Sequence, residues 1–463
     1  MLSDDILLHI FDSYRREWIL NLVRLGMWPW RALVHVCRRW RRIAFGCPHY
    51  LKLYPSCEAK TDVHAALDIW QALPLSIFAR LNEKYAYDNI ISALEHRDRF
   101  AVIYLLELNH YEIERCIALM QEPFPVLRSL HLMADQQKKL VINIPGTFLG
   151  GSAPLPQSIR LCGFRFPGLP KLLASTSDLV YLNLRDFPMT GKGHISPDAM
   201  TTCLSVLTKL RSLTLILTSS FRLRGSPYPT DQRPPSSAHT VLPALTHLFL
   251  QGPHGYLEDF VARVDTPLLN GASLTFTDEP TFDDPRVPQF IRRTKVFHLL
   301  DGVEPSFHRE RVFAYVHSSI GPADVYLSSQ RSGLPAQVAI AEQIFAQWPP
   351  LVSHVQLLTL DDYYHSFEEE TLGETAKPWL GLLRRFSVVH TLRLLERPTM
   401  FHLAHILRDL EGERATEVLP ALRTIELIYS PRYPSEALDL LRPFLAAREE
   451  WGQPVVINVG YTF

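Results

Sequence analysis

Apolar and polar residues alternate in short segments along most of this chain, as they do in strands that bury one face. The segments recur at intervals of roughly 23 to 35 residues, which is the range of leucine-rich repeats. The clear copies are residues 126–132, 179–184, 210–215, 245–250, 389–394 and 422–427, and the weaker copies are residues 159–161, 269–276, 296–300 and 355–360.

Helix-like segments lie between these strands, and they cover residues 196–207, 256–264, 336–348, 401–410 and 435–448. The first has Ser196 as a candidate cap and Pro197 at the first helical position. A strand–helix unit cannot bury its own apolar face, so successive units stack into a solenoid. A doubly wound parallel sheet would also alternate in this way, but it would not repeat Leu-x-x-Leu-x-Leu so often. The pattern favours an α/β fold built as an irregular, leucine-rich-repeat-like solenoid.

The first residues of the chain follow a helical pattern instead. Their apolar side chains fall at helical spacing and form one stripe of Leu2, Ile6, Leu7, Ile10 and Phe11. Ser3 is a candidate cap for this helix, and Asp4 and Asp5 lie where the helix dipole favours negative charge. A short helix with so broad an apolar stripe needs another surface to pack against.

A second helical run covers residues 30–44. One side of it collects Leu33, Val36, Cys37, Trp40, Ile43 and Ala44, and the other collects Arg31, His35, Arg38, Arg39 and Arg42. The apolar side either binds a partner or belongs to the core of a larger N-terminal domain. Its arginines, with Arg41, could contact phosphate, but the net charge of −1 favours a solvated helix face.

These two helical runs resemble an F-box. That motif begins with Leu-Pro-x-Asp/Glu-Ile/Val-Leu and Ile-Phe, and here residues 2–7 and 10–11 correspond to it. It ends with Leu-x-x-Val-Cys-Arg-x-Trp and a small apolar pair, which residues 33–40 and 43–44 match. Ser3 replaces the usual proline, and the spacer is longer than in a compact F-box. Fungal F-box-like proteins often carry such a long, tryptophan-rich spacer.

The resemblance implies a substrate-recognition adaptor of a ubiquitin ligase of the Skp–cullin–F-box type. The F-box would bind the Skp-type adaptor and, through it, the cullin, while the repeats would bind an unidentified protein target. The chain itself would be no enzyme and would need no cofactor or metal. The alternatives are an interaction scaffold not coupled to ubiquitination and a hydrolase or transferase on an α/β sheet. The implied adaptor contacts are Leu2, Ile6, Leu7, Ile10, Phe11, Leu33, Val36, Cys37 and Trp40.

Length and composition set the domain organisation. A chain of 463 residues is too long for one compact core. We expect a short helical F-box in residues 1–57, a helical linker or cap in residues 58–122, and the solenoid in residues 123–463. The 47% of hydrophobic residues is ample for burial, and near-neutral charge predicts no nucleic-acid or membrane partner. Six scattered cysteines, no evident signal peptide and no apolar run of about 18 residues indicate the cytosol or nucleus.

A search for catalytic and metal motifs finds no strong candidate. Residues 191–193 and 150–154 only partly match a phosphate-binding loop and a nucleophile elbow. His402 and His405 lie three apart on a predicted helix without a local third ligand, which favours ordinary core or surface histidines. The carboxylates of residues 368–370 are best explained as a solvated charge run within an acidic loop, residues 361–374. A second loop, residues 219–240, is proline-rich.

Overall fold

The computed structural model divides into two compact units, Met1–Leu179 and Val180–Phe463. The predicted motifs at residues 191–193 and 368–370 and most of both predicted loops lie outside the residues that the structure describes. The structure describes residues 2–11, 13, 29–46, 63–69, 74–80, 86–134, 142–188, 194–218, 239–278, 286–308, 311–318, 323–330, 333–347, 352–362, 372–395, 397–429 and 435–461.

The first unit begins with helices and continues into a parallel sheet, in the strand order β1-β2-β3-β5. Residues 4–11 are helical. The helices that follow are α2 (Pro29–Val36), α3 (Arg38–Gly46), α4 (Val63–Ile69), α5 (Ala86–Glu95), α6 (His110–Leu119), the 3-10 turn η3 (Phe148–Gly151) and α7 (Leu169–Ala174). The strands are β1 (Leu75–Arg80), β2 (Phe100–Leu108), β3 (Ser129–Ala134) and β5 (Ser158–Cys162), with the short pair β4 (Ile142–Asn143) and β6 (Phe164–Arg165).

Residues 58–122 contain two strands, β1 and β2, although the sequence predicts a helical segment. Both strands are nearly continuous apolar runs, and Leu75, Ser76 and Ile77 are buried in succession. A strand buried on both faces has no alternation, so periodicity cannot distinguish it from a buried helix. The sheet therefore begins well before residue 123, where the predicted solenoid starts.

The second unit is a larger sheet, in the strand order β7-β8-β10-β12-β15-β14-β13-β16-β17-β18-β19. Its strands are β7 (Tyr181–Pro188), β8 (Ser212–Thr218), β10 (His247–Gly252), β12 (Gly271–Phe276), β13 (Gly302–His308), β14 (Arg311–His317), β15 (Asp324–Gln330), β16 (Leu357–Asp362), β17 (Thr391–Leu395), β18 (Thr424–Tyr429) and β19 (Val456–Tyr461), and β9 (Thr240–Val241) pairs separately with β11 (Val264–Asp265).

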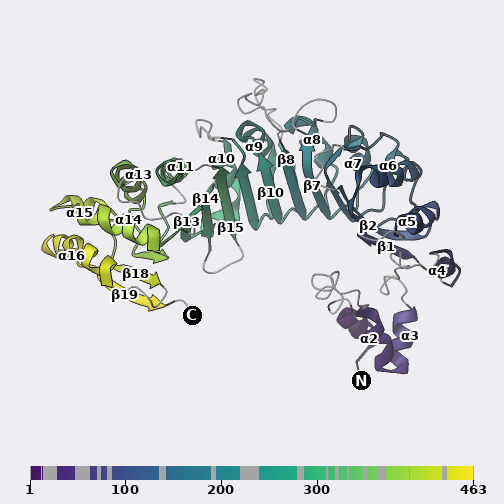
Figure 1. Cartoon of the computed structure of the whole chain (residues 1–463), viewed down its shortest axis with the longest axis horizontal. Helices are drawn as coiled ribbons and strands as arrows, with labels where there is room; N and C mark the ends of the chain where they lie inside the picture. Colours follow the sequence, from purple (N-terminus) through teal and green to yellow (C-terminus); the bar gives the residue numbers. More distant parts are fainter. Residues whose placement is uncertain are drawn as a thin grey trace. The chain divides into compact units, whose positions relative to one another are not determined.

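Helices lie along one face of this second sheet (Figure 1). They are α8 (Pro197–Leu204), α9 (His254–Val261), α10 (Arg286–Arg293), η4 (Lys295–Leu299), α11 (Leu334–Ala346), α13 (Leu372–Arg384), α14 (Arg397–Arg408), α15 (Arg414–Glu417) and α16 (Ser435–Glu450). Ser196 caps α8, because its Oγ accepts a hydrogen bond from the Ala199 amide at 3.2 Å.

The repeated leucines form the core beneath these helices. Alternate residues of the strands, such as Leu248 and Leu250 in β10 or Leu392 and Leu394 in β17, are almost fully buried. The α/β prediction is confirmed at the level of a mixed fold with a mostly parallel sheet. The six clear repeat segments coincide with β3, β7, β8, β10, β17 and β18.

The pattern is wrong at one place in the second unit. Residues 296–300 lie mostly in the 3-10 helix η4, and the following residues instead form β13, β14 and β15. Here β14 runs antiparallel to both of its neighbours. Aromatic and small residues replace the leucine signature in these strands, so the repeat pattern does not reveal them. Part of the predicted acidic loop also differs, since Asp361 and Asp362 are the last residues of β16 and α13 begins at Leu372.

Candidate partner-binding surface

The helix of residues 4–11 is divided into a buried side and an exposed apolar side. Ser3 Oγ accepts a hydrogen bond from the Ile6 amide at 3.4 Å, as expected of a helix cap. On the exposed side, Leu2, Ile6 and Ile10 retain 50%, 47% and 38% of their accessible surface. Their spacing of four residues places them along one stripe. Leu7 and Phe11 are buried, so these two predicted contacts belong to the core.

The second run is two helices instead of the one that the sequence predicts. α2 ends at Val36 and α3 begins at Arg38. Cys37 caps α3, because its Sγ accepts from the Trp40 amide at 3.4 Å and its carbonyl oxygen accepts from the Arg41 amide at 3.0 Å. The break changes the direction of the side chains that a continuous helix would place together, so Val36 and Cys37 are exposed while Val34 is buried.

A ring pair and the hydrogen bonds of one arginine join the first residues of the chain to α3. The rings of Phe11 and Trp40 meet edge to face, with centroids 4.9 Å apart. The Arg39 guanidinium donates to the Asp4 carboxylate at 2.5 Å and to the Leu2 carbonyl oxygen at 2.6 Å. The prediction that Arg39 lies on a solvated face is therefore wrong, because this side chain connects two segments 35 residues apart.

Another arginine connects α3 to α2. The Arg41 Nε donates to the Val34 carbonyl oxygen at 3.0 Å, so this side chain satisfies one of the free carbonyl groups of α2. Arg38 and Arg42 lie exposed beside it. Two of the four arginines of this helix therefore act within the protein, which weakens the case for a phosphate-binding face.

The exposed residues define what we call the N-terminal apolar surface: Leu2, Ile6, Ile10, Val36 and Cys37. Leu33 and Trp40, which the resemblance also implies as contacts, are half-buried. The residues 4–11, α2 and α3 together form the N-terminal helical group. Exposed apolar residues in this number on so small a group are typical of a binding site rather than of an ordinary solvated surface.

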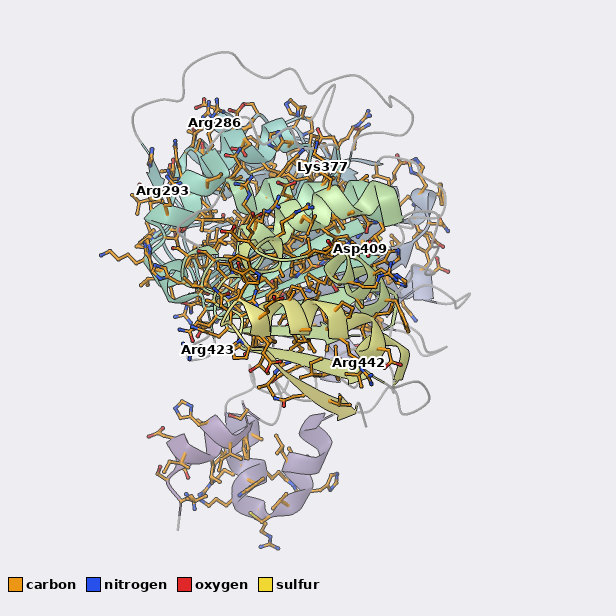
Figure 2. The ribbon with its side chains drawn as sticks, turned by 90° about the vertical axis from the view of Figure 1, so that its left-hand side faces the viewer. Arg286, Arg293, Lys377, Asp409, Arg423 and Arg442 are labelled. Atoms are coloured by element: carbon orange, nitrogen blue, oxygen red, sulfur yellow. The ribbon has the colours of Figure 1, made fainter. Side chains whose placement is uncertain are left out.

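A buried charged cluster between α9 and α10 is the strongest candidate for an alternative, catalytic site. Asp259 binds Arg286 and lies 3.6 Å from Arg263. Glu258 Oε2 accepts from the Val287 amide at 2.9 Å, at the start of α10. Arg286 and Arg293 stand at the two ends of that helix (Figure 2). Both carboxylates are occupied by groups of the protein, so this cluster joins two helices and offers no free acid or base.

The remaining candidates also fall within the core. His402 is buried in α14 and His405 is half-buried one turn later. Across the described ranges, no group of three or more histidine, cysteine or acidic residues could hold a metal ion. Nor does any helix in the described part of the chain have the length and apolarity needed to cross a bilayer.

Comparison with known proteins yields neither a matching family model nor a curated relative.

Proposed function

We propose that this chain is a substrate-recognition adaptor of a Skp–cullin–F-box type ubiquitin ligase. The observation that carries the proposal is the N-terminal apolar surface. Leu2, Ile6 and Ile10 are exposed on a helix whose other side is already packed by Leu7 and Phe11. A helix with one apolar side packed and another exposed suits insertion into a partner's groove.

We further propose that the strand–helix units of the second unit form a degenerate solenoid. Strands join the sheet in chain order from β7 to β12 and again from β16 to β19, as stacked repeats do. Helices follow along one face, which leaves the other face of the strands for contact with a target. In this arrangement the ubiquitin-transfer chemistry belongs to other subunits.

The alternative is an interaction scaffold that is not coupled to ubiquitination. It shares the exposed surface and the repeats with the adaptor, and differs only in the partner of the N-terminal helical group. The identity of that partner therefore distinguishes the adaptor function from the scaffold function.

Copurification with a Skp-type adaptor tests the proposal. Ile6→Ser with Ile10→Ser should abolish capture, because both side chains are exposed and their loss removes apolar contact area without opening the core. The matched control is Val241→Ser with Leu268→Ser, which removes two apolar side chains of the second unit that are somewhat more exposed than Ile6 and Ile10. The proposal is wrong if the wild-type chain fails to capture the adaptor, or if both double variants capture it equally.

A further inference from the structure

Aromatic and acidic side chains gather on the open face of the second sheet, where β13, β14 and β15 interrupt the parallel order. The strand register places Phe249, Ser273, Tyr326, Tyr315 and Glu304 in one row, one residue from each of five adjacent strands. All five side chains are half-buried. The residues between them along each strand point to the opposite face, toward the helices, and are buried there.

The next row of the same face contains His247, Gly271, Asp324, His317 and Gly302. Its two glycines make room for their neighbours. A Cβ atom at Gly271 would lie only 2.6 Å from Asp324 Oδ1, and a Cβ at Gly302 would collide with the His317 imidazole. Because Gly271 has no side chain, the Asp324 carboxylate can lie close to the backbone of β12. Gly271 separates Asp324 from His247 in this row.

Ring contacts extend the two rows into a continuous aromatic surface. The Phe313 and Tyr326 rings lie 5.3 Å apart, and the Tyr315 ring stacks on His317 at 5.1 Å. We call Phe313, Tyr315, Tyr326, Glu304 and Asp324 the aromatic–acidic patch.

The carboxylates of this patch lie close to its rings. Burial and the negative charges of Asp324 and Glu304 raise the pKa of Tyr315. Burial also raises the pKa of Asp324, although His247 opposes this effect. Neither carboxylate is among the ion pairs with lysine or arginine found across the described residues. Arg311 borders the patch, because it lies on the same face of β14, two residues from Phe313, and its charge opposes the rise in the pKa of Tyr326. It stands four residues from Tyr315, which is about 13 Å along a strand, on the side away from Asp324.

We propose that the aromatic–acidic patch binds an arginine side chain presented by a partner peptide. A guanidinium group is planar, so it stacks on aromatic rings and at the same time donates paired hydrogen bonds to a carboxylate. The patch supplies both features: three rings on adjacent strands and two carboxylates without a lysine or arginine partner in the described part of the chain. This proposal does not depend on the adaptor function, because it concerns the second unit alone.

Three matched peptides test the proposal with the full-length chain. The probes are Gly-Ser-X-Ser-Gly, where X is arginine, lysine or citrulline, and their affinities are measured by saturation-transfer NMR. The arginine peptide should bind about tenfold more tightly than the citrulline peptide, which keeps the shape but lacks the charge. Equal affinities for these two, a tighter complex with lysine, or no saturation up to about 10 mM arginine peptide would each overturn it.

Variants locate the binding to the patch. Glu304→Gln with Asp324→Asn should lower the affinity for the arginine peptide about tenfold or more, because both charge-assisted contacts are lost. The control, Glu426→Gln with Glu449→Gln, removes the same charge from β18 and α16 and should leave the affinity unchanged. Thermal unfolding checks that each variant folds. If the double variant does not fold, the single variant Glu304→Gln is used for the binding measurement. Equal binding by the patch variant and the control contradicts the proposal.

Discussion

Apolar residues are used in opposite ways in the N-terminal helical group and in the second sheet. Leu2, Ile6 and Ile10 are exposed on their helix, whereas Leu248 and Leu250 of β10 lie in a continuous buried layer. The helical group is joined by a small set of buried apolar side chains, a ring pair, a partly exposed ion pair and arginine hydrogen bonds to backbone carbonyl oxygens. The second unit is joined by paired strands and by buried hydrogen bonds between its helices. The first region leaves apolar side chains of its helices exposed, whereas the strands of the second bury their leucines beneath the helices.

The largest expected effect lies in the second unit, at Arg448. This side chain is completely buried in α16 and donates to the carbonyl oxygens of Ala415 and Val418 at 2.9 and 3.1 Å. Arg448→Met keeps much of the volume but leaves these acceptors without a donor, which should cost about 3 kcal/mol in the free energy of unfolding. Urea unfolding of the full chain measures it. A loss below about 1 kcal/mol would mean that water replaces the guanidinium.

In the helical group the largest effect is expected at Trp40. Trp40→Ala removes the edge-to-face contact with Phe11 and should loosen the first helix by about 2 kcal/mol. Hydrogen exchange of residues 4–11 should accelerate, while exchange in β8 and β10 stays unchanged. Trp40→Phe retains a ring, so residues 4–11 should exchange more slowly in this variant than in the alanine variant. Faster exchange throughout the sheet would show that the two regions are energetically coupled.

Arg39 provides a smaller test of the same group. Arg39→Ala removes the ion pair with Asp4 and the bond to the Leu2 carbonyl oxygen, so adaptor affinity should fall about fivefold. This exceeds what a solvated arginine would contribute. Arg42→Ala is the matched control, since Arg42 is exposed on the same helix. If both variants bind alike, the Arg39 contacts do not position the first helix.

The smallest expected effect is a pH dependence confined to the second unit. Burial raises the pKa of Tyr326 from 10.0 to about 12, although Arg311 opposes the change. The folded state therefore favours the neutral phenol, and this stabilisation is complete below pH 10 and is lost as pH rises toward 12. The loss should be about 1 kcal/mol, because the half-exposed ring is partly solvated.

Tyr326→Phe removes this titrating group, so its unfolding free energy should fall less between pH 10 and 12 than that of the wild type. Denaturant titrations at several pH values measure the difference between the two proteins. Identical pH profiles would show that Tyr326 titrates alike in the folded and unfolded chains.

The sequence predicts a helix or strand well when the residues that determine it lie within that element. The repeated leucines of β8 and β10 alternate within one strand, and Ser196 caps α8 within three residues, so both are visible in the sequence. The break between α2 and α3 at Cys37 is not visible in the sequence, because apolar periodicity continues across it and only the backbone direction changes. Exposure of Ile6 beside buried Leu7 likewise depends on how the helices pack.

Other features depend on residues that are distant along the chain. The Asp4–Arg39 contact joins residues 35 positions apart, so it cannot be inferred from either helix alone. The aromatic–acidic patch requires the register of several strands, including the antiparallel β14, which the leucine pattern does not contain. Sequence patterns thus predict the repeated core well and the two proposed binding surfaces only in part.

Hydrogen exchange of the full-length chain, with and without a saturating Skp-type adaptor, tests most directly whether the N-terminal apolar surface is the docking site. Residues 2–11 and 33–44 should be protected on binding, because their exposed side chains and the amides beside them become buried. Exchange in β7 to β19 should remain the same. Protection in the second sheet without protection of residues 2–11, or no protection at all, would contradict the proposed adaptor function.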